Sequence, residues 1–90
     1  MSDICIQIGN TDNKLTQQEW SEFCGAMRGL CEAHGDVHFS GGAPTDAPWQ
    51  NYCLCVSTET PDALRELVTK RRSKHKQDSV AWLQGNTQFV

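Results

Sequence analysis

The sequence predicts one mixed α+β domain. Four short segments alternate apolar and polar residues as strands do, and two longer segments repeat apolar residues every three or four positions as helices do. Ninety residues leave room for a single hydrophobic core. The predicted elements are, in chain order, a strand at 3–9, a helix at 16–35, strands at 36–41 and 51–57, a helix at 60–76 and a strand at 78–84.

The first helix has the clearest local signals. Thr16 followed by Glu19 is a capping box, and Gly35 is expected to end the helix as its C-cap. Gly25 and Gly29 each weaken a helix by up to about 1 kcal/mol, so we expect them to mark places where a strand or a partner approaches closely. One apolar stripe follows the helix, made of Trp20, Phe23, Cys24, Met27, Leu30 and Cys31.

The second helix is expected to begin after Thr60 as N-cap, with Pro61 in the first helical position. Its inner stripe is predicted to consist of Leu64, Leu67, Val68 and Arg71. After the last strand, Gly85-Asn86 has the composition of a two-residue turn, which predicts that 87–90 folds back as a short extra strand.

The order β-α-β-β-α-β predicts a ferredoxin-like sandwich, an antiparallel sheet with both helices on one face. Right-handed crossovers place the first and third strands at the centre of the sheet. Strict alternation assigns to the helix face the side chains of Ile4, Ile6, Ile8, Val37, Phe39, Leu54 and Val56. It leaves an open face with Cys5, Gln7, His38, Ser40, Cys53, Cys55 and Ser57.

Charge and composition exclude several classes of protein. A net charge of −3 gives no support to a nucleic-acid binder, whose surface would be strongly basic. The chain has no secretory signal and no apolar stretch near the roughly 20 residues that span a bilayer, so we expect a cytoplasmic protein without membrane contact. It contains no phosphate loop, nucleophile elbow or dinucleotide fingerprint, so an enzyme is the less favoured class and no cofactor is predicted.

The five cysteines are expected to be reduced, because their number is odd and no export signal precedes them. Cys53 and Cys55 are two residues apart on a strand, so their Cβ atoms are separated by about 7 Å. A tetrahedral zinc ion needs its sulfurs nearer about 3.8 Å, so no metal is predicted. On the open face, cysteines behave as small hydrophobes. An apolar face of this kind predicts a homodimer or another protein partner.

Two surface segments are candidate contacts. Residues 41–51 exceed the 2–5 residues that a hairpin loop needs, and they combine two prolines with a tryptophan. The candidate partner-binding residues are Thr45, Asp46, Trp49, Gln50 and Asn51, together with His38. The second segment is a basic patch at the end of the second helix, Lys70, Arg71, Arg72, Lys74 and Lys76. These cations complement the helix dipole, or they contact a phosphate or an acidic partner.

The segments "IGNTDNKLTQQEW", "PTDAPWQNYCLC" and "QDSVAW" resemble small uncharacterised proteins of actinobacteria and their phages. The resemblance extends over most of the chain. It implies an accessory or phage-encoded origin and, by analogy, a protein that acts by binding a host protein.

The leading hypothesis is therefore a non-enzymatic protein-interaction module that uses the open sheet face and the 41–51 loop. The alternative is a small-ligand-binding protein or compact enzyme, with His38 and Asp46 in a pocket between the open face and Trp49. A redox or metal sensor built on Cys5, Cys53 and Cys55 is a third hypothesis.

Replacing Trp49 distinguishes a binding anchor from a lid over the core. If Trp49 anchors a partner, Trp49→Ala changes stability by less than about 1 kcal/mol and weakens binding by about 2 kcal/mol or more. If it closes the core, the substitution costs about 3–5 kcal/mol of stability. A thermal melt beside a binding assay measures both. Collapse of the melting temperature with binding retained by the folded fraction would contradict the anchor role.

Overall fold

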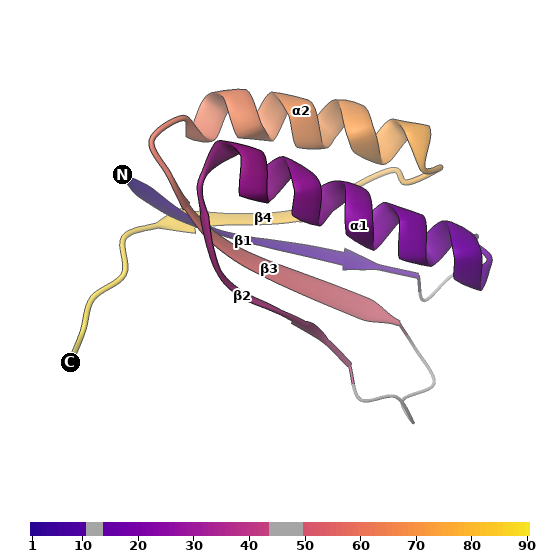
Figure 1. Cartoon of the computed structure of the whole chain (residues 1–90), viewed down its shortest axis with the longest axis horizontal. Coiled ribbons are helices and arrows are strands. Elements are labelled where there is room, and N and C mark those ends of the chain that lie inside the picture. Colours follow the sequence, from indigo (N-terminus) through magenta and orange to yellow (C-terminus); the bar gives the residue numbers. More distant parts are fainter. Residues whose placement is uncertain (11–13, 44–49) are drawn as a thin grey trace.

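Two helices cover one face of a four-stranded antiparallel sheet in the computed structural model (Figure 1). The structure describes residues 1–10, 14–43 and 50–90. The elements are β1 (Ser2–Gly9), α1 (Gln17–His34), β2 (Asp36–Gly42), β3 (Asn51–Thr58), α2 (Pro61–Lys74) and β4 (Ala81–Gly85). The strand order β2-β3-β1-β4 puts the first and third strands at the centre, which confirms the predicted ferredoxin-like topology.

The core lies between the sheet and the two helices. β1 supplies Ile4, Ile6 and Ile8, and β3 supplies Leu54 and Val56, all of them buried as predicted. The helices close this layer with the fully buried side chains of Phe23, Met27, Cys31, Leu64 and Val68. Partly buried side chains complete it, among them Trp20, Cys24, Leu30, Val37 and Trp82. The predicted stripe of α1 therefore packs into the core, whereas the stripe of α2 does so through Leu64 and Val68 only, because Leu67 and Arg71 are just partly buried.

The capping box of α1 forms as expected. The Glu19 amide donates to Thr16 Oγ1 at 3.2 Å, and the Thr16 amide donates to the Glu19 carboxylate at 3.0 Å. Gly35 is the C-cap of α1, as predicted, and its φ of 178° is extended backbone and not the left-handed conformation that is common at this position. Glycine stands there because a Cβ would overlap the carbonyl oxygen of Ser57 on β3.

Asn10 organises the connection between β1 and α1. It is buried, its side-chain amide donates to the Leu15 carbonyl at 3.0 Å, and its side-chain oxygen accepts from the Leu15 amide at 3.1 Å. The same side chain donates to Gln50 Oε1 at 2.9 Å, and its backbone amide donates to the Gln50 carbonyl at 2.9 Å. Asn10 thus joins the start of α1 to the start of β3.

A β-bulge in β2 changes which side chains face the helices. Val37 pairs with Val56, but Phe39 pairs with Cys55, so β2 contains one residue more than β3 at this point. Beyond the bulge every side chain lies on the face opposite to that expected from simple alternation. Phe39 is therefore on the open face and is 55% exposed, which corrects its assignment to the core. Ser40 moves to the helix face, where Arg28 donates to its hydroxyl at 3.4 Å.

The C-terminal residues do not form the predicted extra strand. β4 runs from Ala81 to Gly85, and residues 86–90 follow without regular structure. The Thr87 amide donates to Asp3 Oδ2 on β1 at 2.7 Å. This bond directs the tail across the end of β1 instead of back along β4. Figure 1 shows the tail leaving the sheet beside the N-terminus.

The two glycines inside α1 offer a direct test of helix stability. Gly25 and Gly29 are exposed, and a Cβ added at either meets no described atom within 4 Å, so the expected close approach does not occur within the described residues. Gly25→Ala and Gly29→Ala should each raise the free energy of unfolding by about 0.5–1 kcal/mol, because alanine has the higher helix propensity. Urea denaturation measures the change. A loss of stability from either substitution would contradict the exposure of this helix face.

Candidate functional site

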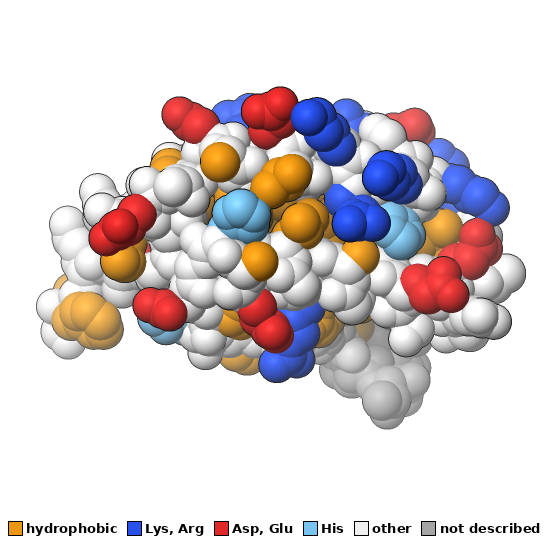
Figure 2. Space-filling model, turned by 45° about the horizontal axis from the view of Figure 1, so that its top comes forward, with side chains coloured by type: hydrophobic (Ala, Val, Ile, Leu, Met, Phe, Trp, Pro, Cys, Tyr) orange, Lys and Arg blue, Asp and Glu red, His pale blue; other side chains and the backbone are white. Residues whose placement is uncertain are grey.

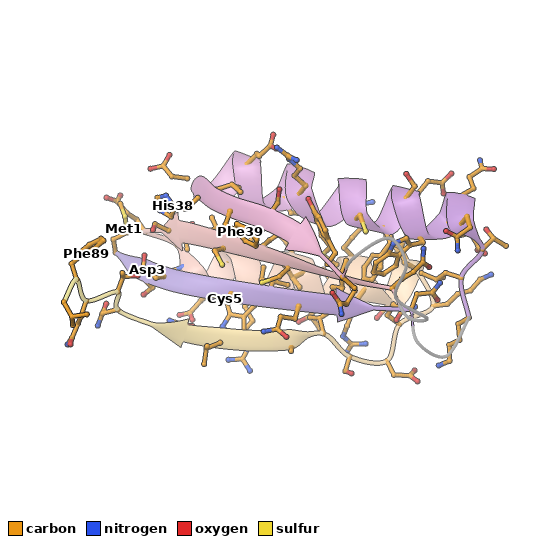
Figure 3. The ribbon with its side chains drawn as sticks, turned by 90° about the horizontal axis from the view of Figure 1, so that it is seen from below. Met1, Asp3, Cys5, His38, Phe39 and Phe89 are labelled. Atoms are coloured by element: carbon orange, nitrogen blue, oxygen red, sulfur yellow. The ribbon has the colours of Figure 1, made fainter. Side chains whose placement is uncertain are left out.

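The open face of the sheet is the candidate functional surface. Its floor contains Cys5 and Gln7 from β1, Cys53, Cys55 and Ser57 from β3, Phe39 from β2, and Leu83 from β4, as the strand register dictates. Neither helix covers this face, which Figure 3 shows in front of both helices. Phe39 is 55% and Leu83 67% exposed, while the three cysteines are half-buried. The face is therefore apolar and open to solvent.

One end of the open face is hollowed into a groove of about 830 Å³. Its floor includes Cys5 and Cys55, and its sides include Leu83 and the tail residue Phe89. Polar groups line the end of the groove, among them Asp3, His38, Ser57 and Thr87. The groove has the size of a small-molecule site, and Figure 3 shows Asp3, His38 and Phe89 gathered at this end of the sheet.

Asp3, Ser57 and His38 form a hydrogen-bonded chain across three strands. The Ser57 hydroxyl donates to Asp3 Oδ1 at 2.5 Å, and His38 Nε2 lies 2.6 Å from the same hydroxyl oxygen. A hydroxyl has one proton to donate, so Ser57 accepts from His38, and Nε2 carries a proton. The second ring nitrogen of His38, Nδ1, takes no part in this chain of hydrogen bonds.

This chain of three contains the residue types of a serine hydrolase but not their connectivity. In a catalytic triad the histidine accepts the serine proton, and the acid orients the histidine. Here Ser57 donates to the acid and accepts from the histidine, and it is only 7% exposed. The arrangement therefore orders the groove end and does not activate Ser57 as a nucleophile.

The Asp3 carboxylate is held in its ionised form by hydrogen bonds. The Ser57 hydroxyl and the side chain and backbone amide of Thr87 lower the pKa of Asp3 from 3.8 to about 2. The nearby His38 adds a smaller effect in the same direction. Asp3 thus connects β1, β3 and the C-terminal tail.

The cysteines of the open face do not form one cluster. Cys5 and Cys55 are directly opposite in the β1–β3 register, with their sulfurs 3.3 Å apart. Cys53 is opposite Gln7. In the part of the chain that the structure describes, no three or more His, Cys, Asp or Glu side chains are placed to hold a metal ion.

The predicted partner-binding residues are divided between two ends of the sheet. Thr45, Asp46 and Trp49 lie outside the described residues. Gln50 and Asn51 lie at the start of β3, where Gln50 donates to Gln17 at 2.7 Å. His38 lies beside Ser57 near the end of β3, about 20 Å away along the strand. His38 and the 50–51 pair therefore do not meet in one site, and the groove is at the His38 end.

The basic patch lies on the helical side of the molecule, away from the open face. Figure 2 shows most Lys and Arg side chains gathered over the half of this surface where α2 ends. Three of the five have partners within the chain. Lys70 pairs with Glu66 at 3.2 Å, Lys76 pairs with Glu19 at 3.0 Å, and Arg72 donates to the Gln77 carbonyl at 3.0 Å. These contacts favour a structural role at the helix terminus.

The open face of the sheet was predictable from the sequence, but much of the groove was not. Asp3, Leu83 and Phe89 line the groove but are not among the site residues predicted from the sequence. A strand at 78–84 that alternates like β1 puts Leu83 on the same face as Cys5 once β1 and β4 are paired. The position of Leu83 on the open face could therefore have been predicted from the alternation. No sequence signal indicates the contact between Asp3 and Thr87, which are 84 residues apart.

Comparisons with known proteins do not assign the chain to a family. No protein-family model matches the chain, and no curated protein matches it. Among the described residues, no helix has the length and apolar character that crossing a membrane requires.

Asp3→Asn tests the charge at the end of the groove. Because the pKa of Asp3 is lowered to about 2, its carboxylate stabilises the fold above the unfolded-state value near 3.8, and this contribution is lost as the pH falls towards 2. The variant should be less stable than the wild type at pH 7, and the difference should shrink below about pH 4 and vanish only below about pH 2. Urea denaturation across this pH range measures both chains.

Glu19→Gln is the matched control, because the Thr16 amide and Lys76 lower the pKa of Glu19 to about 2 at the distant start of α1. Its effect should have the same pH dependence and should add to that of Asp3→Asn. Equal stability of wild type and Asp3→Asn at pH 7 would contradict the role given to this carboxylate.

Proposed function

We propose that the chain is a non-enzymatic protein-interaction module whose open sheet face, with the adjoining 41–51 loop, binds a protein. The observation that carries the proposal is the exposure of Phe39 and Leu83 on a sheet face that neither α1 nor α2 covers. The resemblance to proteins of actinobacteria and their phages favours an accessory or phage-encoded protein that binds a host protein. The lack of an activated nucleophile in the Asp3–Ser57–His38 chain argues against catalysis there.

The composition of the face supports burial against another surface. An antiparallel sheet with one face in water usually alternates apolar residues inside and polar residues outside. Here Cys5, Cys53 and Cys55 occupy outward positions on the two central strands. Phe39 and Leu83 continue the apolar surface onto β2 and β4. Exposed apolar surface of this extent indicates an interaction site.

A second copy of the chain is the first partner to test. The face carries little charge, so two copies meet without like-charge repulsion. Four strands about 4.8 Å apart, with about six residues each, offer about 400 Å² per copy, roughly half of what each partner contributes to a standard interface. We therefore expect a weak homodimer, which assembles at micromolar or higher concentrations. We also expect the tail residue Phe89, which is 95% exposed, to add to the contact between the two copies.

Small-ligand binding is the second candidate function. It is favoured by the groove, because Asp3, Ser57 and His38 converge at one end of an apolar cavity of about 830 Å³. The pocket expected between the open face and Trp49 depends on a residue outside the described ranges. Gly42 and Asn51, on either side of residues 43–50, lie at the end of the sheet opposite to the groove. A ligand of this groove would be mostly apolar, with one group that hydrogen-bonds to His38.

Charge on the open face should prevent self-association. Leu83→Asp or Phe39→Asp should weaken the dimer at least about tenfold, since a desolvated charge at the centre of an interface costs more than 1.4 kcal/mol. Both side chains are exposed in the single chain, so folding stability should change by less than about 0.5 kcal/mol. Sedimentation equilibrium over a concentration series measures the association.

Ala63→Asp is the matched control, because Ala63 is exposed in the first turn of α2 on the opposite side of the molecule. It should leave association unchanged. A wild-type chain that stays monomeric at all concentrations would contradict the homodimer. If that monomer binds an apolar dye stoichiometrically, and Leu83→Asp abolishes the binding, the ligand-binding function is favoured instead.

A further inference from the structure

Cys5 and Cys55 are placed as a disulfide-forming pair. They are direct partners in the β1–β3 register, and their sulfurs are 3.3 Å apart. Opposite residues of an antiparallel pair have Cα atoms about 4.5–5.5 Å apart, within the range of about 4.4–6.8 Å that disulfides use. A disulfide bond is about 2.04 Å long, so the sulfurs need to approach by little more than 1 Å, which side-chain rotation and a small shift of the strands supply.

The other three cysteines lack this geometry. Cys53 faces the same side as Cys55 but is opposite Gln7, so it has no thiol across from it. Cys24 and Cys31 belong to the helical side of the core, where burial raises the pKa of each thiol to about 11. Thiolate, the reactive form, is therefore scarce at both core positions. Any thiol oxidation of the folded chain should favour the open-face pair.

We propose that Cys5 and Cys55 form a reversible intramolecular disulfide by exchange with a low-molecular-weight disulfide such as oxidised glutathione. The Cys55 thiolate attacks one sulfur of glutathione disulfide, which breaks its S–S bond and releases one glutathione thiolate. Cys5 then loses its proton and attacks the Cys55 sulfur of the mixed disulfide, releasing the second glutathione. Two cysteine thiols are oxidised, and one glutathione disulfide is reduced to two glutathiones.

The surroundings of the pair support this order of events. In the unassociated chain the groove gives an oxidant access, because both cysteines line it and are only half-buried. The hydrogen bond to Cys55 and partial burial raise the pKa of Cys5, which favours Cys55 as the thiol that reacts first. Cys55 is then the target of the first exchange, and Cys5 is the resolving thiol. Because the resolving thiol is next to the mixed disulfide, we expect the mixed disulfide to be short-lived.

The experiment uses the full chain under native conditions. Reduced protein is incubated in buffers of varied oxidised-to-reduced glutathione ratio, quenched with acid, alkylated and mapped by peptide mass spectrometry. We expect a Cys5–Cys55 cross-linked peptide whose amount follows the ratio and which disappears on addition of dithiothreitol. The intact mass should fall by two hydrogen atoms, and the melting temperature should rise, because the bond joins the two central strands.

Cys53→Ser is the matched control, since it removes a thiol from the same strand and face. It should form the cross-link as the wild type does. Cys5→Ser should accumulate the mixed disulfide of glutathione at Cys55, and Cys55→Ser should form no intramolecular disulfide. The wild-type and Cys53→Ser results decide the question even if a Cys5 or Cys55 variant fails to fold.

Two results would overturn the proposal. One is a wild-type chain whose Cys5 and Cys55 stay unlinked in excess oxidised glutathione while Cys53 is glutathionylated. The other is a Cys5–Cys55 linkage that appears only when urea unfolds the chain, as circular dichroism recorded in parallel would reveal.

Discussion

Four strands present two faces, and the described residues of this chain form two helices to cover them. α1 and α2 both lie on one side of the sheet (Figure 1). There they bury the isoleucines of β1 and the apolar side chains of β3. Right-handed β-α-β crossovers allow no other placement. Everything proposed for the molecule depends on this asymmetry. The covered face supplies the core, and the uncovered face retains apolar side chains that nothing in the described chain shields.

A single inserted residue gives the open face much of its character. The bulge in β2 turns Phe39 away from the helices, and His38 beside it reaches the hydroxyl of Ser57. Bulges often re-aim side chains next to functional sites. Without this one, Phe39 would add to the core and the open face would lose its largest side chain on that edge. Asp3 then completes the groove by joining Ser57 to the C-terminal tail.

Local pattern and chain topology account for the parts of this fold that could be predicted. Periodicity located the elements, Thr16 and Glu19 located a helix start, and crossover handedness located β1 beside β3. The bulge was beyond reach, because "DVHFSGG" alternates equally well in either register. The contact of Asp3 with Thr87 joins the two ends of the chain, and no local sequence pattern indicates it. The open face was therefore predictable, whereas its groove was not.

The central claim is that the open face, not the helical surface, meets another protein molecule. The most direct measurement is a concentration series of methyl NMR spectra of the wild-type chain. Ala81 and Leu83 report on the open face, and Ala33 and Ala63 report on the exposed sides of α1 and α2. We expect the methyl resonances of Ala81 and Leu83 to shift as concentration rises, while those of Ala33 and Ala63 stay constant. Shifts confined to the helical methyls, or none at any concentration, would contradict the claim.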